Sequence, residues 1–112
     1  HRFQRFFEEA PLGIALINTQ EVIEDCNVQF AAILGLEPSD IEGRHFEHFI
    51  SQPSREDILK TVSRIGEGHE ISGPMEITLK GKDRIVETQM HARRFGTSGS
   101  VVLHFIDLTQ QK

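Results

Sequence analysis

The sequence predicts an α+β domain with a five-stranded antiparallel sheet and helices on one face. Segments of strand character form two groups, one towards each end of the chain, and tight turns link the members of each group. The first group comprises 13–18 and 22–26, and the second comprises 75–80, 85–95 and 101–106. The residues between the groups repeat apolar side chains at helical spacing. Tight turns imply antiparallel pairing, and strands segregated from helices are typical of this class.

The first strand is apolar on both of its faces. Ile14 and Leu16 lie on one side of the strand, and Ala15 and Ile17 lie on the other. A strand of this kind is covered on both sides. We therefore expect the central helices to cover one face of the sheet, and another element to cover the opposite face.

Capping and turn residues divide the middle of the chain. Asn27 suits the N-cap of a helix, and Gly35 suits the left-handed position that follows one. The broken pattern over 37–51 predicts short helical turns and loop. Glycines place two further turns, at 81–83 and 96–99, between the last three strands.

A longer helix is predicted after the broken stretch. Pro53 and Ser54, followed by Asp57, resemble a capping box, and the apolar residues that follow share one helical face over about three turns. Gly66 and Gly68 end this helix.

A short amphipathic helix is predicted at the N-terminus, over 1–10. Phe3, Phe6 and Phe7 form one apolar stripe, and Pro11 ends the helix. These rings require burial. Two partners remain open: the domain's own sheet, or the same helix of a second chain in a symmetric homodimer.

Length and composition restrict the class of protein. The 112 residues make one domain, and a hydrophobic content of 38% with 26% charged residues is typical of a globular chain. No apolar run approaches the roughly 20 residues that span a bilayer. The single cysteine, Cys26, excludes an internal disulfide and suits a reducing compartment, so we expect a cytoplasmic protein. Because the chain starts at His1 rather than Met, we interpret it as a piece of a longer protein.

The charge argues against two kinds of partner. The net charge is −5, and the sequence has no basic block. Binding to nucleic acid or to an anionic membrane surface needs clustered positive charge. We therefore expect neither partner.

The order of elements and several local motifs resemble a PAS domain, over nearly the whole chain from Phe6 to Lys112. Each motif is weak alone, but six in the same order are fairly specific for the fold. The segments that carry the resemblance are Phe7–Ala15, Cys26–Phe30 with Leu34 and Gly35, Asp40–Arg44, Pro53–Gly68, Gly81–Arg84 and Asp107–Thr109.

The resemblance implies a strand order of 2-1-5-4-3 and a sensory or regulatory function. Such domains commonly precede an output domain, which in a two-component or related bacterial system is a histidine kinase, a diguanylate cyclase or phosphodiesterase, or a transcription factor. Asp107 and Thr109 match the motif at which the chain leaves the sheet for a signalling helix. The resemblance also favours a homodimer. The alternatives are a ligand-free dimerisation module and, more weakly, a haem or flavin redox sensor.

A ligand pocket in such a fold would lie between the sheet and the helices. Its lining is mostly apolar, so we expect an apolar or aromatic ligand, with Gln29, Thr88 or Arg93 as polar anchors. The same residues would equally form a filled core. The candidate lining residues are Phe30, Ile33, Phe46, Phe49, Ile58, Val62, Ile65, Met75, Ile77, Met90, Leu103 and Phe105.

Cofactors and catalysis find little support. Cys26 lies outside the motif of flavin-adduct domains of this family, and we interpret it as a structural residue. His45 and His48 share a spacing that suits one helix face, but no third ligand accompanies them, and we predict no metal site. The resemblance implies that a haem ligand would be a His on the long helix. This helix contains no His, so the remaining candidate for a haem ligand is His69, just beyond its end. The sequence also lacks a P-loop, a nucleophile elbow and an HExxH motif, so we expect no enzyme activity within this domain.

Overall fold

The computed structural model describes residues 12–51, 55–70 and 73–108. The predicted helix over 1–10, with Phe3, Phe6 and Phe7, lies outside these described residues, as does Thr109. The predicted capping residues Pro53 and Ser54 also lie outside them.

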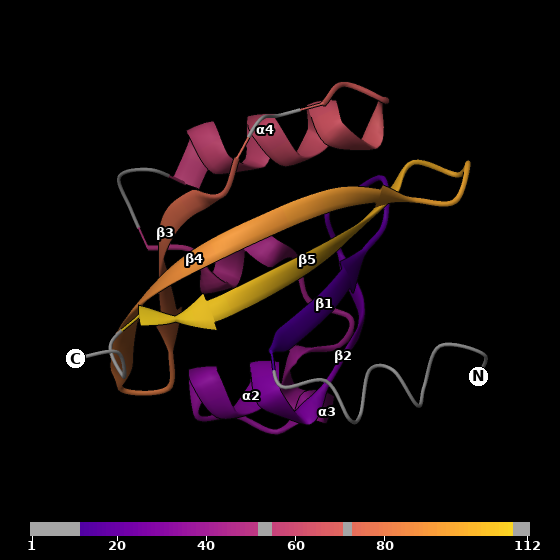
Figure 1. Ribbon diagram of the computed structural model, residues 1–112. Coiled ribbons are helices and arrows are strands. Elements are labelled where there is room, and N and C mark those ends of the chain that lie inside the picture. Colours follow the sequence, from indigo (N-terminus) through magenta and orange to yellow (C-terminus); the bar gives the residue numbers. More distant parts are fainter. Residues whose placement is uncertain (1–11, 52–54, 71–72, 109–112) are drawn as a thin grey trace.

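The five strands form one antiparallel sheet in the order β2-β1-β5-β4-β3, which confirms the predicted fold class and strand order. The last strand in sequence, β5, is central in the sheet and pairs with both β1 and β4 (Figure 1). The predicted turn at 81–83 is one residue too long, because Gly81 still pairs with Arg84. The strands are β1 (Gly13–Ile17), β2 (Ile23–Cys26), β3 (Met75–Gly81), β4 (Arg84–Phe95) and β5 (Ser100–Asp107).

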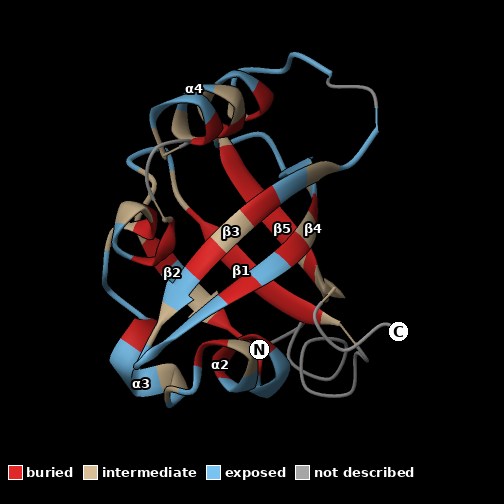
Figure 2. Ribbon diagram, turned by 90° about the vertical axis from the view of Figure 1, so that its left-hand side faces the viewer, coloured by how far each residue is buried: buried red, intermediate tan, exposed pale blue. Residues whose placement is uncertain are grey.

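The helices of the described chain lie on one side of the sheet (Figure 2). Two short helices and a 3-10 turn follow β2, and one longer helix precedes β3, as the sequence predicts. The elements are α2 (Val28–Leu34), α3 (Pro38–Ile41), η1 (Phe46–Phe49) and α4 (Arg55–Gly66).

Asn27 joins the first helix to the first strand. Its Oδ1 accepts hydrogen bonds from the backbone N–H of Phe30, which makes it the N-cap of α2, and from the N–H of Ile14 in β1. Its Nδ2 donates to the carbonyl of Leu12 at 2.8 Å. The side chain is fully buried, so these bonds replace the water that the backbone groups would otherwise bind.

The two faces of the sheet bury two separate apolar clusters. The larger cluster fills the space between the inner face and the helices, and includes Ala15 and Ile17 of β1. The smaller one, on the outer face, comprises Ile14, Leu16 and Val102. This arrangement explains why β1 is apolar on both sides, and burial along the whole strand follows from it (Figure 2).

The C-terminal end of α2 packs closely on the hairpin of β3 and β4. Gly35 follows the helix with a φ of 72°, as the sequence predicts, and Arg84 Nη1 donates to the carbonyls of Ala32 and Ile33. Gly81 lies against the backbone of Leu34. A Cβ added at Gly81 would be only 2.2 Å from the carbonyl oxygen of Leu34. The hairpin and the helix therefore meet backbone to backbone.

We expect Gly35→Ala to lower the free energy of unfolding by about 1–2 kcal/mol, because an L-residue is strained at this positive φ. Gly35→Asn should cost less, since Asn tolerates the left-handed region. Urea unfolding followed by circular dichroism measures both. Equal losses in the two variants would instead assign the cost to the guanidinium of Arg84, which lies 3.0 Å from the position of a Cβ.

Candidate functional site

The structure brings the candidate pocket residues together in one cluster between the sheet and the helices. Ten of the twelve are buried in the inner cluster, while Ile33 and Met75 are partly buried and pack against it. They come from α2, η1, α4, β3, β4 and β5. The inner cluster is thus the place in this fold where a ligand would touch the most elements at once.

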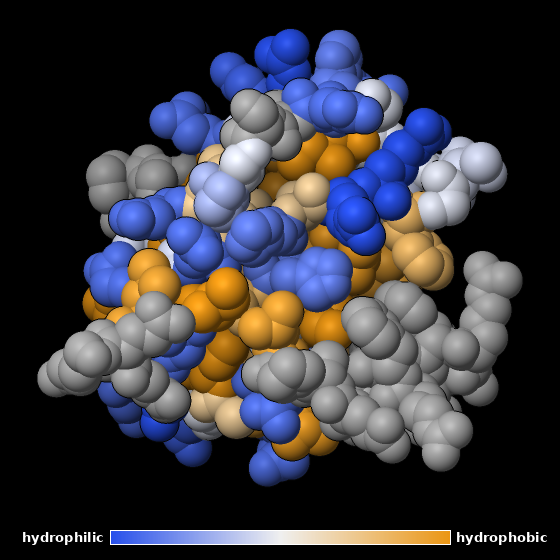
Figure 3. All heavy atoms as spheres, in the orientation of Figure 1, coloured by the Kyte–Doolittle hydropathy of each residue, from blue (hydrophilic) through white to orange (hydrophobic). Residues whose placement is uncertain are grey.

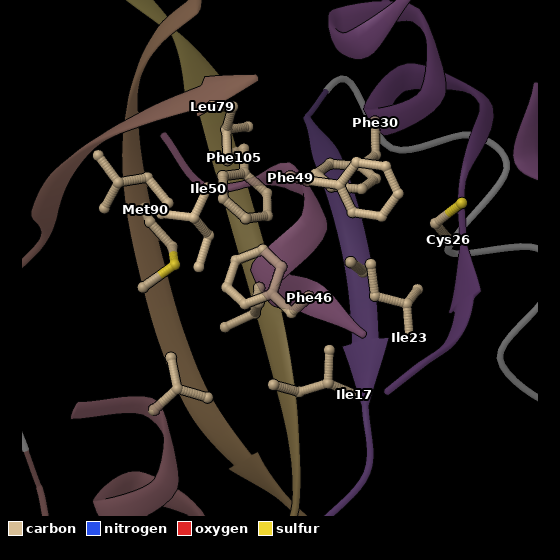
Figure 4. Close-up of a cluster of buried hydrophobic side chains, with 14 of the residues drawn as sticks. Ile17, Ile23, Cys26, Phe30, Phe46, Phe49, Ile50, Leu79, Met90 and Phe105 are labelled. Atoms are coloured by element: carbon tan, nitrogen blue, oxygen red, sulfur yellow. The ribbon is translucent and has the colours of Figure 1, made fainter. Parts of the chain in front are cut away.

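Phenylalanine rings lie in the middle of this cluster, and those of Phe30, Phe46 and Phe105 are in mutual contact through Phe105 (Figure 4). The ring of Phe105 lies 4.9 Å from that of Phe30 and 6.2 Å from that of Phe46, measured between centroids. All three side chains are at most 1% exposed. Because protein cores are close-packed, a ligand can enter here only if these rings move apart.

The inner cluster has few polar groups. Thr88 is fully buried, and its hydroxyl donates to the carbonyl of Ile77 at 2.9 Å. Gln29 and Arg93 are exposed, so the prediction that either of them anchors a ligand in this cluster is wrong. Among the described residues, no buried side-chain nitrogen or oxygen lacks a hydrogen-bond partner. The cluster therefore suits an apolar guest better than a polar one.

The inner cluster is directly connected to the end of the last strand. Phe105 lies on β5 two positions before Asp107, at which this strand ends. Its ring contacts one ring from α2 and one from η1. A change in the packing of these elements therefore acts on the C-terminal end of β5.

The candidate cofactor residues are dispersed. Cys26 is buried at the end of β2. His45 caps η1, with its Nδ1 accepting from the N–H of Glu47, and its Nε2 lies 3.7 Å from Glu21 Oε1. His48 and His69 are exposed, and His69 lies in the loop after α4 rather than in the inner cluster. Within the described ranges, no group of three or more His, Cys, Asp or Glu is placed to hold a metal ion.

The outer face of the sheet carries a feature that the sequence analysis did not select. His91, Arg93 and His104 share this face with apolar side chains, and they line a groove of about 460 Å³. Figure 3 shows hydrophobic and hydrophilic side chains side by side over the strands of this face. Partial burial lowers the pKa of His104, and the positive charges of Arg93 and His91 lower this pKa further.

The described part of the chain contains no helix long and apolar enough to cross a membrane.

Comparisons with known proteins agree with this fold. Residues 7–112 match the family described as the PAS fold. No curated protein matches the chain.

Three solved structures illustrate the similarity. A PAS domain of an HTR-like protein from Haloarcula marismortui is 22% identical, with 95% of this chain and 88% of that chain covered and a TM-score of 0.75. The PAS domain of a LuxR-family transcriptional regulator from Burkholderia thailandensis, solved in complex with ethanol, is 26% identical, with 96% and 97% covered and a TM-score of 0.74. A domain of a sensory box sensor histidine kinase/response regulator from Geobacter sulfurreducens is 16% identical, with 95% and 91% covered and a TM-score of 0.78.

Sequence motifs, sheet topology and the family match thus agree over almost the whole chain. PAS domains are sensory modules of proteins such as histidine kinases and transcriptional regulators, and are generally not catalytic. This chain belongs to the PAS fold family.

Proposed function

We propose that this domain is the sensor of a longer signal-transduction protein of the histidine kinase or diguanylate cyclase/phosphodiesterase type. It detects a small apolar or aromatic ligand, or a protein partner, and passes a conformational change to a C-terminal output domain. The observation that carries the proposal is the position of Phe105, whose ring is central in the inner cluster and which lies two residues before the end of β5.

Packing supplies the mechanism. A guest among the three rings displaces Phe105 against Phe30 or Phe46, and a close-packed core transmits such a displacement instead of absorbing it. The shift changes the position of β5 and the direction in which the chain leaves the sheet at Asp107 and Thr109. The output domain responds only as far as the ligand favours one of the two arrangements over the other.

The second candidate is a dimerisation module that binds no small molecule. The close packing of the three rings favours it, because the inner cluster already excludes solvent without a guest. In this case the signal is carried by the arrangement of two copies, and Phe3, Phe6 and Phe7 are the proposed contact between them. The domain needs no haem, flavin or metal in either case.

Native mass spectrometry of the purified domain, followed by denaturing extraction, tests the two candidates. We expect a bound apolar molecule, and we expect Met75→Phe to lower its occupancy, because a larger side chain at the edge of the inner cluster fills the same space. Ile85→Phe is the matched control, since Ile85 is 64% exposed.

The same spectra separate the outcomes. A ligand-free dimer supports the dimerisation module and contradicts the ligand sensor. A ligand-free monomer at high concentration contradicts both. A bound molecule whose occupancy is the same in the wild type and in Met75→Phe contradicts the inner cluster as its site.

A further inference from the structure

Strand pairing places three basic side chains together on the outer face of the sheet. His91 of β4 pairs directly with His104 of β5, and Arg93 lies two residues along β4 on the same face. Cβ atoms of directly paired residues are about 5 Å apart, and those of next neighbours on one face are about 7 Å apart. The two imidazoles and the guanidinium therefore reach one small region.

The groove beside these groups has the size and composition of a small-ligand site. Its volume is about 460 Å³. Leu12, Pro74 and Ile106 give it apolar walls, and Arg93, His91 and His104 are the basic side chains among its described lining residues. Small-molecule sites typically combine apolar walls with a few convergent polar groups.

In the described part of the chain the three basic side chains form no ion pair, although Glu70, in the loop after α4, lines a neighbouring pocket together with Arg93. None of the three side chains takes part there in a hydrogen bond. On β1, the residue that pairs with His104 is Ile14, which does not titrate. On β3, the nearest carboxylate of this face is Glu76, which pairs with Gln89 one row further along the sheet. The groove therefore gathers one guanidinium and two imidazoles, although the whole chain has a net charge of −5 with His neutral.

We propose that this groove binds a small organic monocarboxylate, with its apolar body against Leu12, Pro74 and Ile106. The guanidinium of Arg93 holds the carboxylate through its forked donors, and His91 and His104 donate further hydrogen bonds.

The charges of the groove favour this occupant over a metal ion. Two imidazoles alone provide only two ligands, and the guanidinium on the same face repels a cation. A carboxylate removes the mutual repulsion of the three groups, and its apolar body covers the exposed walls. The proposal is independent of whether the inner cluster takes a ligand, because the two sites lie on opposite faces of the sheet.

The test is an NMR titration of the isotopically labelled domain with 3-phenylpropionate, at a pH of about 6, where imidazoles begin to carry charge. The neutral amide 3-phenylpropanamide, of the same shape, is the matched control ligand. We expect the carboxylate to shift the signals of His91, His104 and the Ile106 methyl groups, and to leave the methyl groups of Ile77 and Met90 in the inner cluster unchanged. The amide should bind about tenfold more weakly, because it lacks the charge.

Three variants and a change of pH sharpen the test. Arg93→Gln should weaken the carboxylate about tenfold, whereas Arg94→Gln, the same change at the next residue of β4, should not, because successive side chains of a strand point to opposite faces and Arg94 does not line this groove. Affinity should rise as the pH falls from about 7.5 to about 5.5, because burial lowers the pKa of His104 in the free domain and a bound anion makes its protonation more favourable. Replacing His91 and His104 together by Gln should remove this dependence.

Four results would overturn the proposal. These are no binding at millimolar carboxylate, equal affinities for carboxylate and amide, equal effects of Arg93→Gln and Arg94→Gln, and shifts confined to Ile77 and Met90. The last result would place the ligand in the inner cluster and would support the proposed sensor function while excluding the outer site.

Discussion

Phe105→Ala is expected to lower the free energy of unfolding by about 3–5 kcal/mol, because it empties the centre of the inner cluster. The ring is 1% exposed and is in contact with rings from two other elements, so its loss leaves a cavity that neither neighbour can fill without moving. Urea unfolding followed by far-UV circular dichroism is the measurement, since the chain contains neither Trp nor Tyr for fluorescence.

The control for this variant is Ile85→Ala. Ile85 is 64% exposed, and its truncation should change the free energy by no more than about 0.5 kcal/mol. A loss below about 1 kcal/mol in Phe105→Ala would show that the three rings are not close-packed, and would remove the mechanical link between the inner cluster and the end of β5.

Asn27→Ala is expected to have the second largest effect, about 2–4 kcal/mol. Loss of an N-cap costs about 1 kcal/mol, and each buried backbone group left without a partner adds about 1–3 kcal/mol. Here the change removes the acceptor for the N–H groups of both Phe30 and Ile14, and the donor to the carbonyl of Leu12. The same unfolding experiment measures the loss.

Asn18→Ala is the matched control for this prediction. Asn18 Oδ1 also accepts from two backbone N–H groups, those of Gln20 and Val22, but it does so in a turn that solvent reaches. Water replaces the lost bonds there, so the cost should stay near 1 kcal/mol or below. If the two substitutions cost the same, burial of the Asn27 network contributes nothing to stability.

Much of this fold is predictable from the sequence because local signals agree with the final packing. Asn27 and Gly35 bound α2 as their residue types predict, since capping depends only on neighbouring backbone groups. The apolar residues at strand and helix spacing identify the inner cluster, because a periodic pattern selects the buried face. The turn in the β3–β4 hairpin is misplaced by one residue because Gly81 is selected by its close contact with Leu34, which is distant in sequence.

The positions of single polar side chains are harder to predict. Gln29 lies one residue before Phe30, and a rotation of one residue along α2 is enough to turn it from the inner cluster to solvent. Arg93 faces away from the inner cluster because its neighbour Ala92 packs against that cluster and side chains alternate along β4. The pairing of His91 with His104 depends on the exact register of β4 and β5. The predicted four-residue turn over 96–99 is consistent with this register. A shift of one residue in the pairing would place the two imidazoles on opposite faces of the sheet.

The pairing of β1 with β5 also has a consequence for how the domain is made. β1 lies near the start of the chain and β5 near its end, yet Gly13 pairs with Phe105 and Ile17 with Val101. Until β5 has left the ribosome, the sheet consists of two separate hairpins, and isolated two-stranded hairpins have marginal stability in water. Joining them closes a loop of nearly the whole chain, an entropic cost that slows folding. The sheet therefore cannot be completed before β5 is available, and β5 is the last element to enter and the one that joins the two hairpins.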